Sequence, residues 1–582
     1  MNTHEELPQI RHSLAHLLAA AVQELHPGTK NTIGPAIDDG FYYDFEFMSP
    51  ISDKELPALE KKMRSLLPTW KEFTHKEISE KEAREYFKDN PYKLELIEEI
   101  TKKGEKITLY TSGTFTDLCR GGHVGCPAKD IRADAFRLTR IAGAYWRGDE
   151  KNTMLTRIYG HAFETKERLD DYETMQEEAK KRDHKKLGRE LGLFTISPLV
   201  GAGLPLMQPK GMVIRKAVED YLWELHKVRG YQRVWTPHIA KEELYITSGH
   251  AAKFGDELFR VQGKDEKFIM KPMNCPHHMQ IFADNQFSYR HMPVRYFEPA
   301  TVYRDEKTGQ LGGLTRVRSI TQDDGHLFCR VSQINQEVSA IVDIIRNFYT
   351  TIGLMNDYWV SLSVRGDDKS KYLGTDEAWE TAEAALEQAA KDNKLNYKRV
   401  TGEAAFYGPK LDFMFKDAIG REWQLGTIQC DFNLPERFDL SFINEKGEKE
   451  RPVVIHRAIS GSLERFLGII IEHFVGKFPL WLSPVQTRII PIGEAHHAEA
   501  IRIHDMLSAL DIRSEIDLSH DNFGKKVRAA KTEHIPYFII IGDKDIAAGK
   551  ITLESRDKGQ IGQISPEELV AKLTQEIKTR AL

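Results

Sequence analysis

Cysteine and long apolar runs are both scarce in this 582-residue sequence. The five cysteines are scattered and odd in number, which excludes the disulfide framework of a small secreted protein. The longest apolar runs, FLGIII from Phe466 and YFIII from Tyr537, fall far short of the ~20 residues of a membrane-spanning helix. The polar opening MNTHEELPQIRHS carries no secretory signal. We therefore expect a cytoplasmic protein without a membrane partner, whose thiols are free for metal binding or catalysis.

A strong net charge is also absent, because 82 Lys and Arg side chains against 87 Asp and Glu side chains leave −5. This balance argues against binding nucleic acid through bulk charge, although it leaves local basic patches open. The contents of 41% hydrophobic and 29% charged residues are ordinary for a globular protein. No fixed-period repeat or low-complexity tract is visible. The length suggests about three to five domains.

Changes of local pattern divide the chain into four segments. Residues 1–163 open with an amphipathic helix over 11–25, continue with the strand-like FYYDFEF, and predict an α+β domain. Residues 164–190 are charged, with few large apolar side chains, and predict an exposed connecting helix. Residues 191–483 alternate aromatic and β-branched runs with short helices, which predicts an antiparallel sheet. Residues 484–582 alternate strands with helices and predict a separate α/β domain.

The segment KPMNCPHHM, from Lys271 to Met279, places a cysteine beside two histidines. Cys275 could be a metal ligand or a packed interior thiol. The residue types alone favour the interior thiol, because a lone cysteine is usually a small buried hydrophobe. The segment itself leaves both alternatives open.

The composition of an anion-binding site appears in PATVYRDEKTGQLGGLTRVRSITQDDGHLF, residues 299–328. Arg304, Arg316 and Arg318 can approach phosphate, and Glu306 can accept a hydrogen bond from an exocyclic amine. Strand-like arms flank the Gly-rich EKTGQLGG, so the arginines can share one face of a hairpin. A surface hairpin with solvated arginines is at least as good an interpretation of this segment alone.

Two further segments frame that hairpin. HRAISGSLERFLGIIIEH predicts a strand that ends near His456 and a helix that begins near Ser462, with Arg465 in its first turn. A helix N-terminus next to an arginine is a ready anion site. Upstream, residues 211–237 predict a long amphipathic helix, a stop at Gly230 and a strand. Such elements often form interfaces, although an ordinary core helix explains the apolar stripe equally well.

Together these segments carry a resemblance. A long helix and strand, then Arg-x-Glu on a hairpin, then Gly-x-x-Glu-Arg opening a helix is the order found in class II aminoacyl-tRNA synthetases. KPMNCPHHM, TRVRSITQDDGH, REWQLGTIQCDF and HRAISGSLERF resemble segments of bacterial threonyl-tRNA synthetases, from about Arg11 to the C-terminus. The resemblance implies an α+β editing domain, a class II antiparallel catalytic domain and an α/β anticodon-binding domain. It also implies a homodimer that joins threonine to tRNA(Thr) with ATP.

The resemblance further implies one Zn²⁺ per subunit, held by Cys275, His326 and His456. One thiolate and two imidazoles independently suit zinc with one position left open for substrate. A site that engages the threonine hydroxyl can reject valine by about 10⁴ or more, whereas serine loses only a methyl group, worth roughly 1 to 3 kcal/mol. We therefore expect serine to be activated at times. His277 and His278 are expected to be structural or supporting groups.

The family pattern also assigns the groups that bind ATP. Arg304 is expected to hold the α-phosphate, Glu306 the adenine amine, and Arg316 and Arg465 the outer phosphates of a bent ATP with Mg²⁺. Attack by a carboxylate on the α-phosphorus needs no general base, so positioning, arginine and magnesium carry this step. Arg304 and Arg465 are accordingly expected to be catalytic.

Further positions follow from the same match. Residues expected around the aminoacyl-adenylate are Met273, Gln322, Asp324, Tyr407, Lys410, Gln424 and Gln429. Among these, Asp324 is expected to meet the substrate ammonium and Gln429 to contact ATP. His250, in TSGH, matches a family histidine that assists proton transfer from the terminal ribose of tRNA.

The first domain holds a second candidate site. RHSLAH puts two histidines one helical turn apart, and DLCRGGH adds an aspartate, a cysteine and a third histidine. Such a set could bind zinc, but the resemblance indicates an editing pocket that hydrolyses mischarged seryl-tRNA, and we favour metal-free hydrolysis. A lysine in PYKLEL matches another editing position, with a plain surface lysine as the alternative. The expected editing residues are His12, His16, Lys93, Asp117, Cys119 and His123.

The C-terminal domain contains the basic run KKVRAAK, residues 525–531, which can neutralise tRNA phosphate or be a solvated helix face. The sequence departs from the family in three respects. It starts almost directly at the editing domain, without the small ubiquitin-like domain common in bacterial members. His277 stands where glycine is usual, and the Arg-x-Glu segment lacks some residues seen in close relatives. Two rival functions are a non-catalytic RNA-binding regulator with a synthetase fold and a synthetase for serine or proline. The arginines, the Cys/His/His set and the editing domain argue against both.

Overall fold

The computed structural model describes residues 6–582, so the first five residues of the expected signal-free N-terminus lie outside the described part. The chain divides into two compact units, Met1–Glu178 and Ala179–Leu582. Within residues 6–582, no helix is both long and apolar enough to cross a bilayer. All five cysteines are free thiols.

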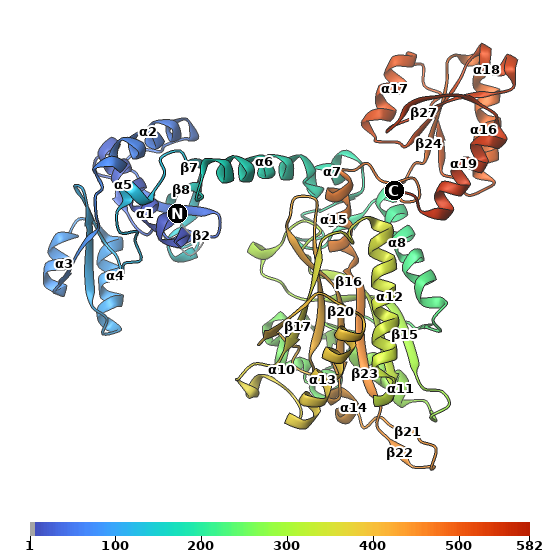
Figure 1. Cartoon of the computed structure of the whole chain (residues 1–582), viewed down its shortest axis with the longest axis horizontal. Helices are drawn as coiled ribbons and strands as arrows, with labels where there is room; N and C mark the ends of the chain where they lie inside the picture. The colour runs from blue at the N-terminus through green and yellow to red at the C-terminus, as the bar shows by residue number, and fades with distance from the viewer. Residues whose placement is uncertain (1–5) are drawn as a thin grey trace. The chain divides into compact units, whose positions relative to one another are not determined.

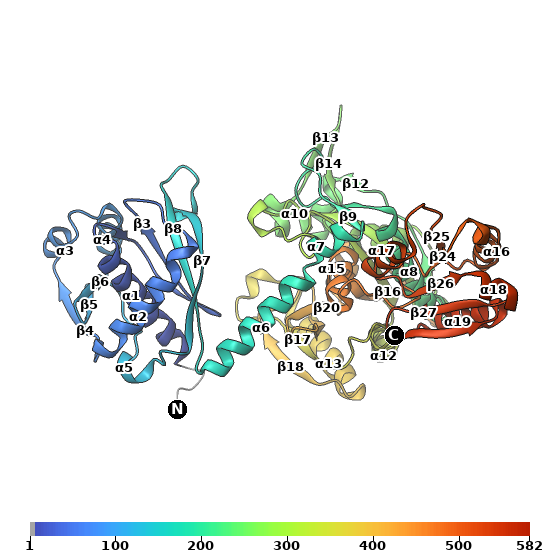
Figure 2. The ribbon, with the colours of Figure 1, turned by 90° about the horizontal axis from the view of Figure 1, so that it is seen from above.

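The first unit is built on a sheet with the strand order β1 (Lys30–Asn31), β3 (Gly40–Glu46), β8 (Met154–Ala162), β7 (Phe136–Tyr145). Helices α1 (Leu7–Leu25) and α2 (Leu56–Leu66) lie against it, as Figure 2 shows. Helix α1 buries an almost continuous row of leucine and alanine side chains, and Phe41, Tyr43 and Phe45 of β3 complete this core. A fully buried Leu or Phe side chain contributes about 1.5–3 kcal/mol. The helix predicted over residues 11–25 is therefore present and four residues longer at its N-terminus.

A second, smaller sheet of this unit has the order β4 (Thr74–Ile78), β5 (Ile107–Ser112), β6 (Phe115–Leu118). It packs with α3 (Glu80–Tyr86) and α4 (Pro91–Lys102), and Cys119 follows β6 directly. The charged segment at 164–190 forms two helices, α6 (Lys166–Arg182) and α7 (His184–Glu190). Asp183 ends the first and caps the second by accepting the Lys185 backbone N–H at 2.7 Å.

The second unit contains an eight-stranded sheet, antiparallel except at its two edges. Its strands, in spatial order, are β11 (Gln232–Arg233), β15 (Val294–Tyr303), β16 (Ser319–Cys329), β23 (Val453–Ser462), β20 (Glu422–Asp431), β19 (Lys410–Lys416), β17 (Tyr358–Val364) and β18 (Tyr397–Thr401). The antiparallel sheet predicted for residues 191–483 is thus present. The predicted strand after Gly230 is only two residues long, so it is shorter than expected.

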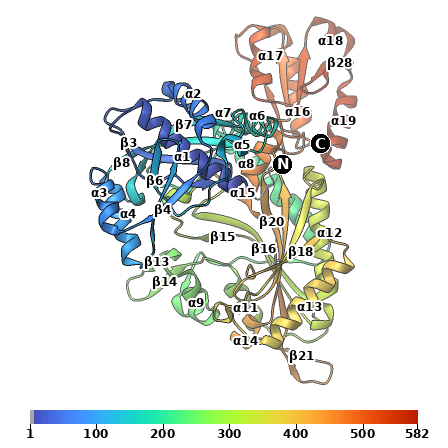
Figure 3. The ribbon, with the colours of Figure 1, turned by 60° about the vertical axis from the view of Figure 1, so that its left-hand side comes forward.

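Three helices lie against this sheet: α12 (Ile334–Ile352), α13 (Asp376–Asp392) and α15 (Leu463–Phe474). Figures 1 and 3 show α12 and α13 side by side along the strands. Helix α8 (Pro209–Lys227) packs on α12 and joins the same core. Strand β23 was expected to end near His456 but continues to Ser462, because β20 pairs with it as far as Ala458 and β16 as far as Ser462. The helix start at Ser462 was correct: its side chain accepts the Arg465 N–H.

The C-terminal part carries a five-stranded sheet in the order β25 (Ser514–Ile516), β24 (Thr487–Pro491), β26 (Tyr537–Ile541), β27 (Ile551–Ser555), β28 (Gly559–Ile564). Helices α16 (His497–Ser508) and α19 (Pro566–Thr579) pack against one face, and α17 (Phe523–Thr532) against the other, as Figure 1 shows. The predicted alternation holds for β24, β25 and β26, which are parallel. Strands β27 and β28 pair antiparallel and were not predicted.

Candidate functional site

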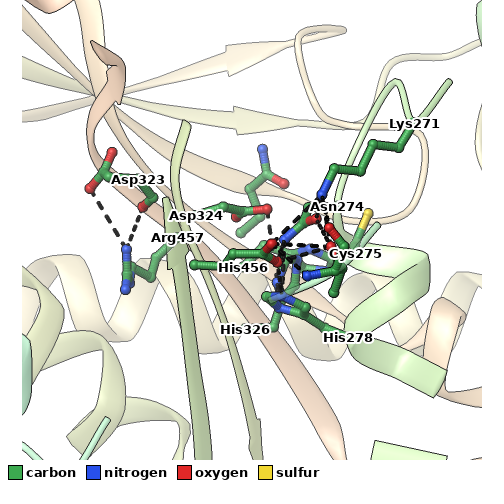
Figure 4. A network of polar contacts seen from close by, with 12 residues as sticks. Lys271, Asn274, Cys275, His278, Asp323, Asp324, His326, His456 and Arg457 are labelled. Atoms are coloured by element: carbon green, nitrogen blue, oxygen red, sulfur yellow. Dashed lines mark hydrogen bonds and ion pairs between the residues drawn. The ribbon is translucent and has the colours of Figure 1, made fainter. Parts of the chain in front are cut away.

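Cys275, His326 and His456 meet in the second unit although 181 positions separate the first from the last. Cys275 is the first residue of α11 (Cys275–Ala283), while His326 in β16 and His456 in β23 are direct cross-strand partners. All three are buried, and their ligand atoms lie within 4.8 Å of one another. Figure 4 shows them converging. The two strands therefore bring together residues that the sequence keeps apart.

The proton positions on His456 are fixed by its surroundings. Its Nε2 lies 2.8 Å from Asp431 Oδ2, and a carboxylate can only accept a hydrogen bond, so Nε2 carries the proton. Its Nδ1 is buried without a hydrogen-bond partner. A buried nitrogen lone pair without a partner is costly unless something else occupies it. His456 thus presents an unsatisfied Nδ1 lone pair to the cluster.

A chain of contacts fixes the tautomer of His326 in the same way. Glu298 Oε2 lies 3.0 Å from His278 Nε2, and Asn274 Nδ2, which is 2.9 Å from the same nitrogen, donates to Glu298 Oε2 at 2.8 Å. With the carboxylate as its acceptor, His278 Nε2 carries the proton and leaves Nδ1 as an acceptor. His278 Nδ1 lies 2.8 Å from His326 Nδ1, which must then be the donor. Burial, together with His456 and His278, lowers the pKa of His326 well below its usual value. The neutral His326 ring therefore leaves Nε2 as its free lone pair.

These residues fit a zinc ion. Two imidazole lone pairs and one thiol form a three-ligand set that suits tetrahedral zinc with an open fourth position. Metal-binding histidines typically have their second nitrogen held by a carboxylate or another fixed acceptor, as both do here. Burial raises the pKa of Cys275 well above its usual value, so its thiolate requires a cation close by.

The surroundings of the cluster include polar residues that sequence reasoning did not identify. Lys271, 1% exposed, donates to Thr236 Oγ1 at 2.7 Å and to Asn274 Oδ1 at 2.9 Å. Asn274 in turn donates to Glu298 Oε2 at 2.8 Å. Although burial alone would raise it, the hydrogen bond from His278 and the charge of Lys271 lower the pKa of Glu298 to about 2. Lys271 and Asn274 could have been identified as site residues from the motif KPMNCPHH, to which they belong. No sequence motif pointed to Glu298.

Arg457 and Asp323 form a second buried pair beside the cluster, also visible in Figure 4. Asp323 accepts the backbone N–H groups of Ile459 and Gly461 at 2.8 and 3.0 Å, which ties β16 to the end of β23. Gly325 is required here, because a Cβ at that position would lie 2.5 Å from Arg457 Nη2. The pair fixes the two strands that carry His326 and His456.

The residues expected around the adenylate lie on β16, β19 and β20 or in the segments just before α11 and β19. Tyr407 stacks on His456 at 4.8 Å between ring centroids and donates to Gln429 Oε1. Asp412, which sequence reasoning did not identify, holds Lys410 at 2.6 Å and Gln424 at 2.8 Å. Of the other three expected residues, Met273 lies just before α11, and Gln322 and Asp324 lie on β16.

Four of the expected ATP-binding residues lie on the loop between β15 and β16 and on α15, and the fifth, Gln429, lies on β20. Arg316 contacts Glu306 through Nε and Nη2 at 3.0 and 2.7 Å. Arg465 donates from Nε to Thr315 O at 3.0 Å, so the helix arginine is attached to this loop. Arg304 donates to Pro272 O at 3.3 Å and lies over the Phe254 ring. The structure thus brings the three arginines and Glu306 to one loop.

His250 begins α10 (His250–Phe254) and is fully buried. Its Nδ1 lies 2.8 Å from Ser248 Oγ, and its Nε2 lies 3.4 Å from Cys275 Sγ. Burial lowers the pKa of His250 to about 3. The structure therefore places His250 against the thiol of the cluster.

A second cluster occurs in the first unit, where α1 faces the segment after β6. The ligand atoms of His12, His16, Cys119 and His123 lie within 4.8 Å of one another. Cys119 Sγ is 3.6 Å from His12 Nε2 and 3.3 Å from His123 Nε2. Burial raises the pKa of Cys119 to about 11, and burial with the neighbouring histidines lowers that of His123 to about 2. These two groups are therefore neutral near pH 7.

A charged pair lies beside this second cluster. Lys93 is 2% exposed, and its Nζ is 2.5 Å from Asp117 Oδ1, so it is not a surface lysine. Tyr43, which sequence reasoning did not single out, donates to Asp117 and accepts from Lys93 at 3.3 Å. The alternation in FYYDFEF was the available signal for its inward position. A cavity of 470 Å³ opens here and is lined by residues that include His12, His16, Tyr43, Lys93, Asp117 and Cys119.

The basic run 525–531 lies on α17 and is largely engaged within the protein. Lys526 is buried and donates to Asp517 O at 3.0 Å. Lys525 pairs with Asp521 and Lys531 with Glu554, both at 2.8 Å. Lys526 therefore faces inward, and phosphate binding stays a prediction for the rest of the run.

Family models match three stretches of the chain. Residues 259–474 match the tRNA synthetase class II core domain (G, H, P, S and T). Residues 486–576 match an anticodon binding domain, and residues 107–159 match the threonyl and alanyl tRNA synthetase second additional domain. The first contains Cys275, His326 and His456, and the third contains Cys119 and His123.

Individual proteins resemble the chain over nearly its full length. The threonine–tRNA ligase of Gloeobacter violaceus is 47% identical, over 99% of this chain and 93% of its own. That of Thermus thermophilus is 45% identical, over 98% and 89%. A crystal structure described as the RNA binding domain of threonyl-tRNA synthetase from Cryptosporidium parvum Iowa II is 35% identical with a TM-score of 0.65, covering 68% of this chain and 98% of that one.

Proposed function

The chain belongs to the threonyl-tRNA synthetases, and on that premise we propose how its two cysteine–histidine clusters divide the work of the enzyme. It is a threonine–tRNA ligase with a class II core, an anticodon-binding domain and an editing domain, as the sequence predicted. Threonine, ATP with Mg²⁺, and tRNA are its substrates and partners. The cluster in the core selects threonine, and the cluster in the first unit removes serine.

Cys275, His326 and His456 would hold zinc in the core, through the thiol and the two free imidazole nitrogens. The observation that carries this proposal is the buried Nδ1 of His456, which has no hydrogen-bond partner while its Nε2 is held by Asp431. When bound, zinc supplies a Lewis-acid position for the amino and hydroxyl groups of threonine. A site that engages a hydroxyl rejects an analogue lacking it by about 10⁴ or more, so valine is excluded.

The loop between β15 and β16, together with Arg465 of α15, binds ATP. Arg304 holds the α-phosphate, Glu306 accepts from the adenine amine, and Arg316 and Arg465 hold the outer phosphates. In the structure Arg316 pairs with Glu306, so ATP binding has to separate them. Because the carboxylate nucleophile needs no base, fixed positive charge and positioning supply the catalysis.

The remaining site residues orient threonine and the adenylate. Asp324 is 13% exposed and faces the ammonium group, and Gln429 contacts ATP. Supporting contacts hold Lys410 and Gln424 to Asp412 and Tyr407 to Gln429. The residues that contact threonine or its adenylate are Met273, Gln322, Asp324, Tyr407, Lys410 and Gln424.

Two less direct roles complete this proposal. His250 assists proton transfer from the tRNA ribose, which requires its Nε2 to leave the Cys275 thiol. The active form is a homodimer of cytoplasmic chains. The four segments 1–163, 164–190, 191–483 and 484–582 act as editing domain, connector, catalytic domain and anticodon-binding domain.

Serine lacks only a methyl group, so discrimination at activation is limited to about 1–3 kcal/mol and a hydrolytic step is needed. The cavity of 470 Å³ beside the first-unit cluster has the size of a small-ligand pocket. We assign hydrolysis to this pocket without metal. The neutral imidazoles of His12 and His16 and the thiol of Cys119 orient water, His123 packs behind them, and the pair Lys93–Asp117 binds the aminoacyl end.

The test of selection is ATP–pyrophosphate exchange with threonine, serine and valine, before and after zinc is removed by a chelator. We expect threonine to be preferred over valine by about 10⁴-fold or more, serine to be activated measurably, and threonine exchange to return when zinc is restored. Exchange with serine or proline but not with threonine would overturn the assignment. For editing, His12→Ala combined with Cys119→Ala should let seryl-tRNA accumulate, and unchanged deacylation would show the pocket to be misplaced.

A further inference from the structure

His184 links the connector segment to the ATP-binding loop. It is the first residue of α7, two positions after α6 ends, and it is 4% exposed. Its ring lies between the loop at Gly313 and Leu314 and helix α15 at Gly468. The backbone N–H of Leu314, which is fully buried, donates to His184 Nε2 at 3.0 Å. A connector residue thus accepts a hydrogen bond from the backbone of the loop that carries Arg316.

The other side of the ring is fixed by Glu472 near the end of α15. His184 Nδ1 lies 2.6 Å from Glu472 Oε1, and the His184 backbone N–H donates to the same oxygen at 3.2 Å. Burial alone would raise the pKa of Glu472, but its hydrogen bonds from His184 and Arg421 lower it to about 2. The ionised carboxylate therefore accepts, and His184 Nδ1 carries the proton.

The ring nitrogens of His184 are satisfied without a metal, although the oxygen and nitrogen atoms of Asp183, His184 and Glu472 lie close enough to hold one. Nε2 of His184 is already used by Leu314, and Nδ1 is protonated. The ring instead has one donor and one acceptor, each with a single fixed partner. The ring therefore fixes the separation between α15 and the loop.

The loop held in this way carries the groups that bind ATP. Thr315, the next residue after Leu314, accepts from Arg465 Nε at 3.0 Å, and Arg316 follows it. Gly313 has a φ of +61°, and a Cβ there would lie 2.3 Å from His184 Nε2, so the loop approaches the ring as closely as a glycine allows. Displacing the ring would shift Thr315 and Arg316 together.

We propose that His184 is a positioning residue for ATP: through its hydrogen bond to Leu314 it sets the loop that places Arg316 and Arg465. The inference rests on the proposed roles of those arginines. It predicts an effect on ATP binding with little effect on threonine binding, since the groups proposed to contact threonine lie outside this loop, on β16, β19 and β20 and in the segments before α11 and β19.

Two amide substitutions separate the two contacts of the ring. His184→Asn keeps a donor near Glu472 and removes the acceptor for Leu314, whereas His184→Gln keeps an acceptor near Leu314 and removes the donor. Leaving a buried N–H without its acceptor is costly, so His184→Asn should raise KM for ATP about 10-fold or more. His184→Gln should stay within about threefold of wild type. KM for threonine and seryl-tRNA deacylation should be unchanged in both.

The matched control is His473→Asn, one position along α15 from Glu472, which should leave KM for ATP unchanged. A rise in KM for threonine as large as that for ATP would show a general loss of structure and overturn the proposal. If His184→Asn does not fold, Gly313→Ala tests the same contact from the loop side and should raise KM for ATP alone.

Hydrogen exchange of the full chain gives a readout that does not depend on activity. The Leu314 amide should exchange slowly in wild type and in His184→Gln, and at least about 10-fold faster in His184→Asn. If the Leu314 amide of His184→Asn exchanges at the wild-type rate, the positioning role is wrong, even when the variant activates threonine normally. If the chain fails to activate threonine but shows the predicted exchange pattern at Leu314, the proposed ATP-binding role of the loop is wrong. The hydrogen bond between His184 and Leu314 is then still supported.

Discussion

The two clusters contain the same residue types but are supported differently. In the core, each histidine has its second nitrogen held by an acceptor chain that ends in a carboxylate, Asp431 for His456 and Glu298 for His326. In the first unit, the histidines pack on one another and on Phe73, with His12 and His123 stacked at 4.4 Å. One arrangement points lone pairs at a common centre, and the other surrounds a cavity with neutral side chains.

On the roles proposed above, this difference teaches that residue identity does not distinguish a metal site from a hydrolytic pocket. The supporting hydrogen bonds decide, because they fix the tautomer and orientation of each ring. The first-unit pocket places the buried pair Lys93 and Asp117 beside the histidines. That is a suitable arrangement for binding a charged aminoacyl group next to a reactive water.

The largest expected effect is the difference in zinc content and activity between the variants Cys275→Ala and Cys119→Ala. Cys275→Ala should reduce zinc from about one ion per chain to near zero and lower threonine-dependent exchange by more than about 100-fold, beyond the usual loss from a supporting residue. Cys119→Ala should retain the zinc and the exchange activity. Metal analysis after gel filtration measures this, and loss of zinc in Cys119→Ala would show that the first unit also binds metal.

A large effect is also expected from breaking the buried pair in the first unit. Lys93→Ala leaves Asp117 buried without its cation, which costs about 3–5 kcal/mol of unfolding free energy for that unit. Deacylation of seryl-tRNA should fall, while zinc content and threonine activation stay the same. Lys102→Ala on the same helix removes an exposed pair with Glu98 and should cost less than about 1 kcal/mol. Equal losses in the two variants would contradict a special role for Lys93.

A smaller effect is expected from the chain that holds His326. His278→Ala removes the acceptor for His326 Nδ1 and should weaken zinc binding about 10- to 100-fold without abolishing it. The neighbouring His277 is buried with both ring nitrogens unpartnered, so His277→Ala should change zinc affinity by less than about threefold. Competition with a chelator of known affinity measures both. Identical zinc affinities for the two variants would show that the tautomer chain does not support the site.

The smallest effect concerns acid sensitivity of the first unit. Burial, with the neighbouring His16 and His12, lowers the pKa of His123 to about 2, so the unfolded chain takes up a proton there below about pH 6.5 and the folded chain does not. Stability is therefore present above pH 6.5 and is lost as the pH falls, by roughly 1 kcal/mol for this group at pH 5.5. Hydrogen exchange of α1 peptides between pH 7.5 and 5.5 should show this, and His123→Gln should reduce the slope.

Much of the fold was predictable from sequence because its signals are local. Amphipathic periodicity identified α1 and α8, and the turn before Ser462 identified the start of α15. The errors have tertiary causes. Strand β23 runs six residues past His456 because β20 pairs with it as far as Ala458 and β16 as far as Ser462. Strands β27 and β28 add to an otherwise parallel sheet by antiparallel pairing.

The sequence by itself determined the family and the reactive residue types, since motifs in a fixed order are local strings of letters. It could not determine that Lys93 is buried with Asp117, that Lys526 faces inward, or that Tyr43 and Glu298 join the sites. Nor could it show which nitrogen of each histidine carries a proton. Those properties depend on which atoms become neighbours across strands and helices, and only the tertiary structure decides that.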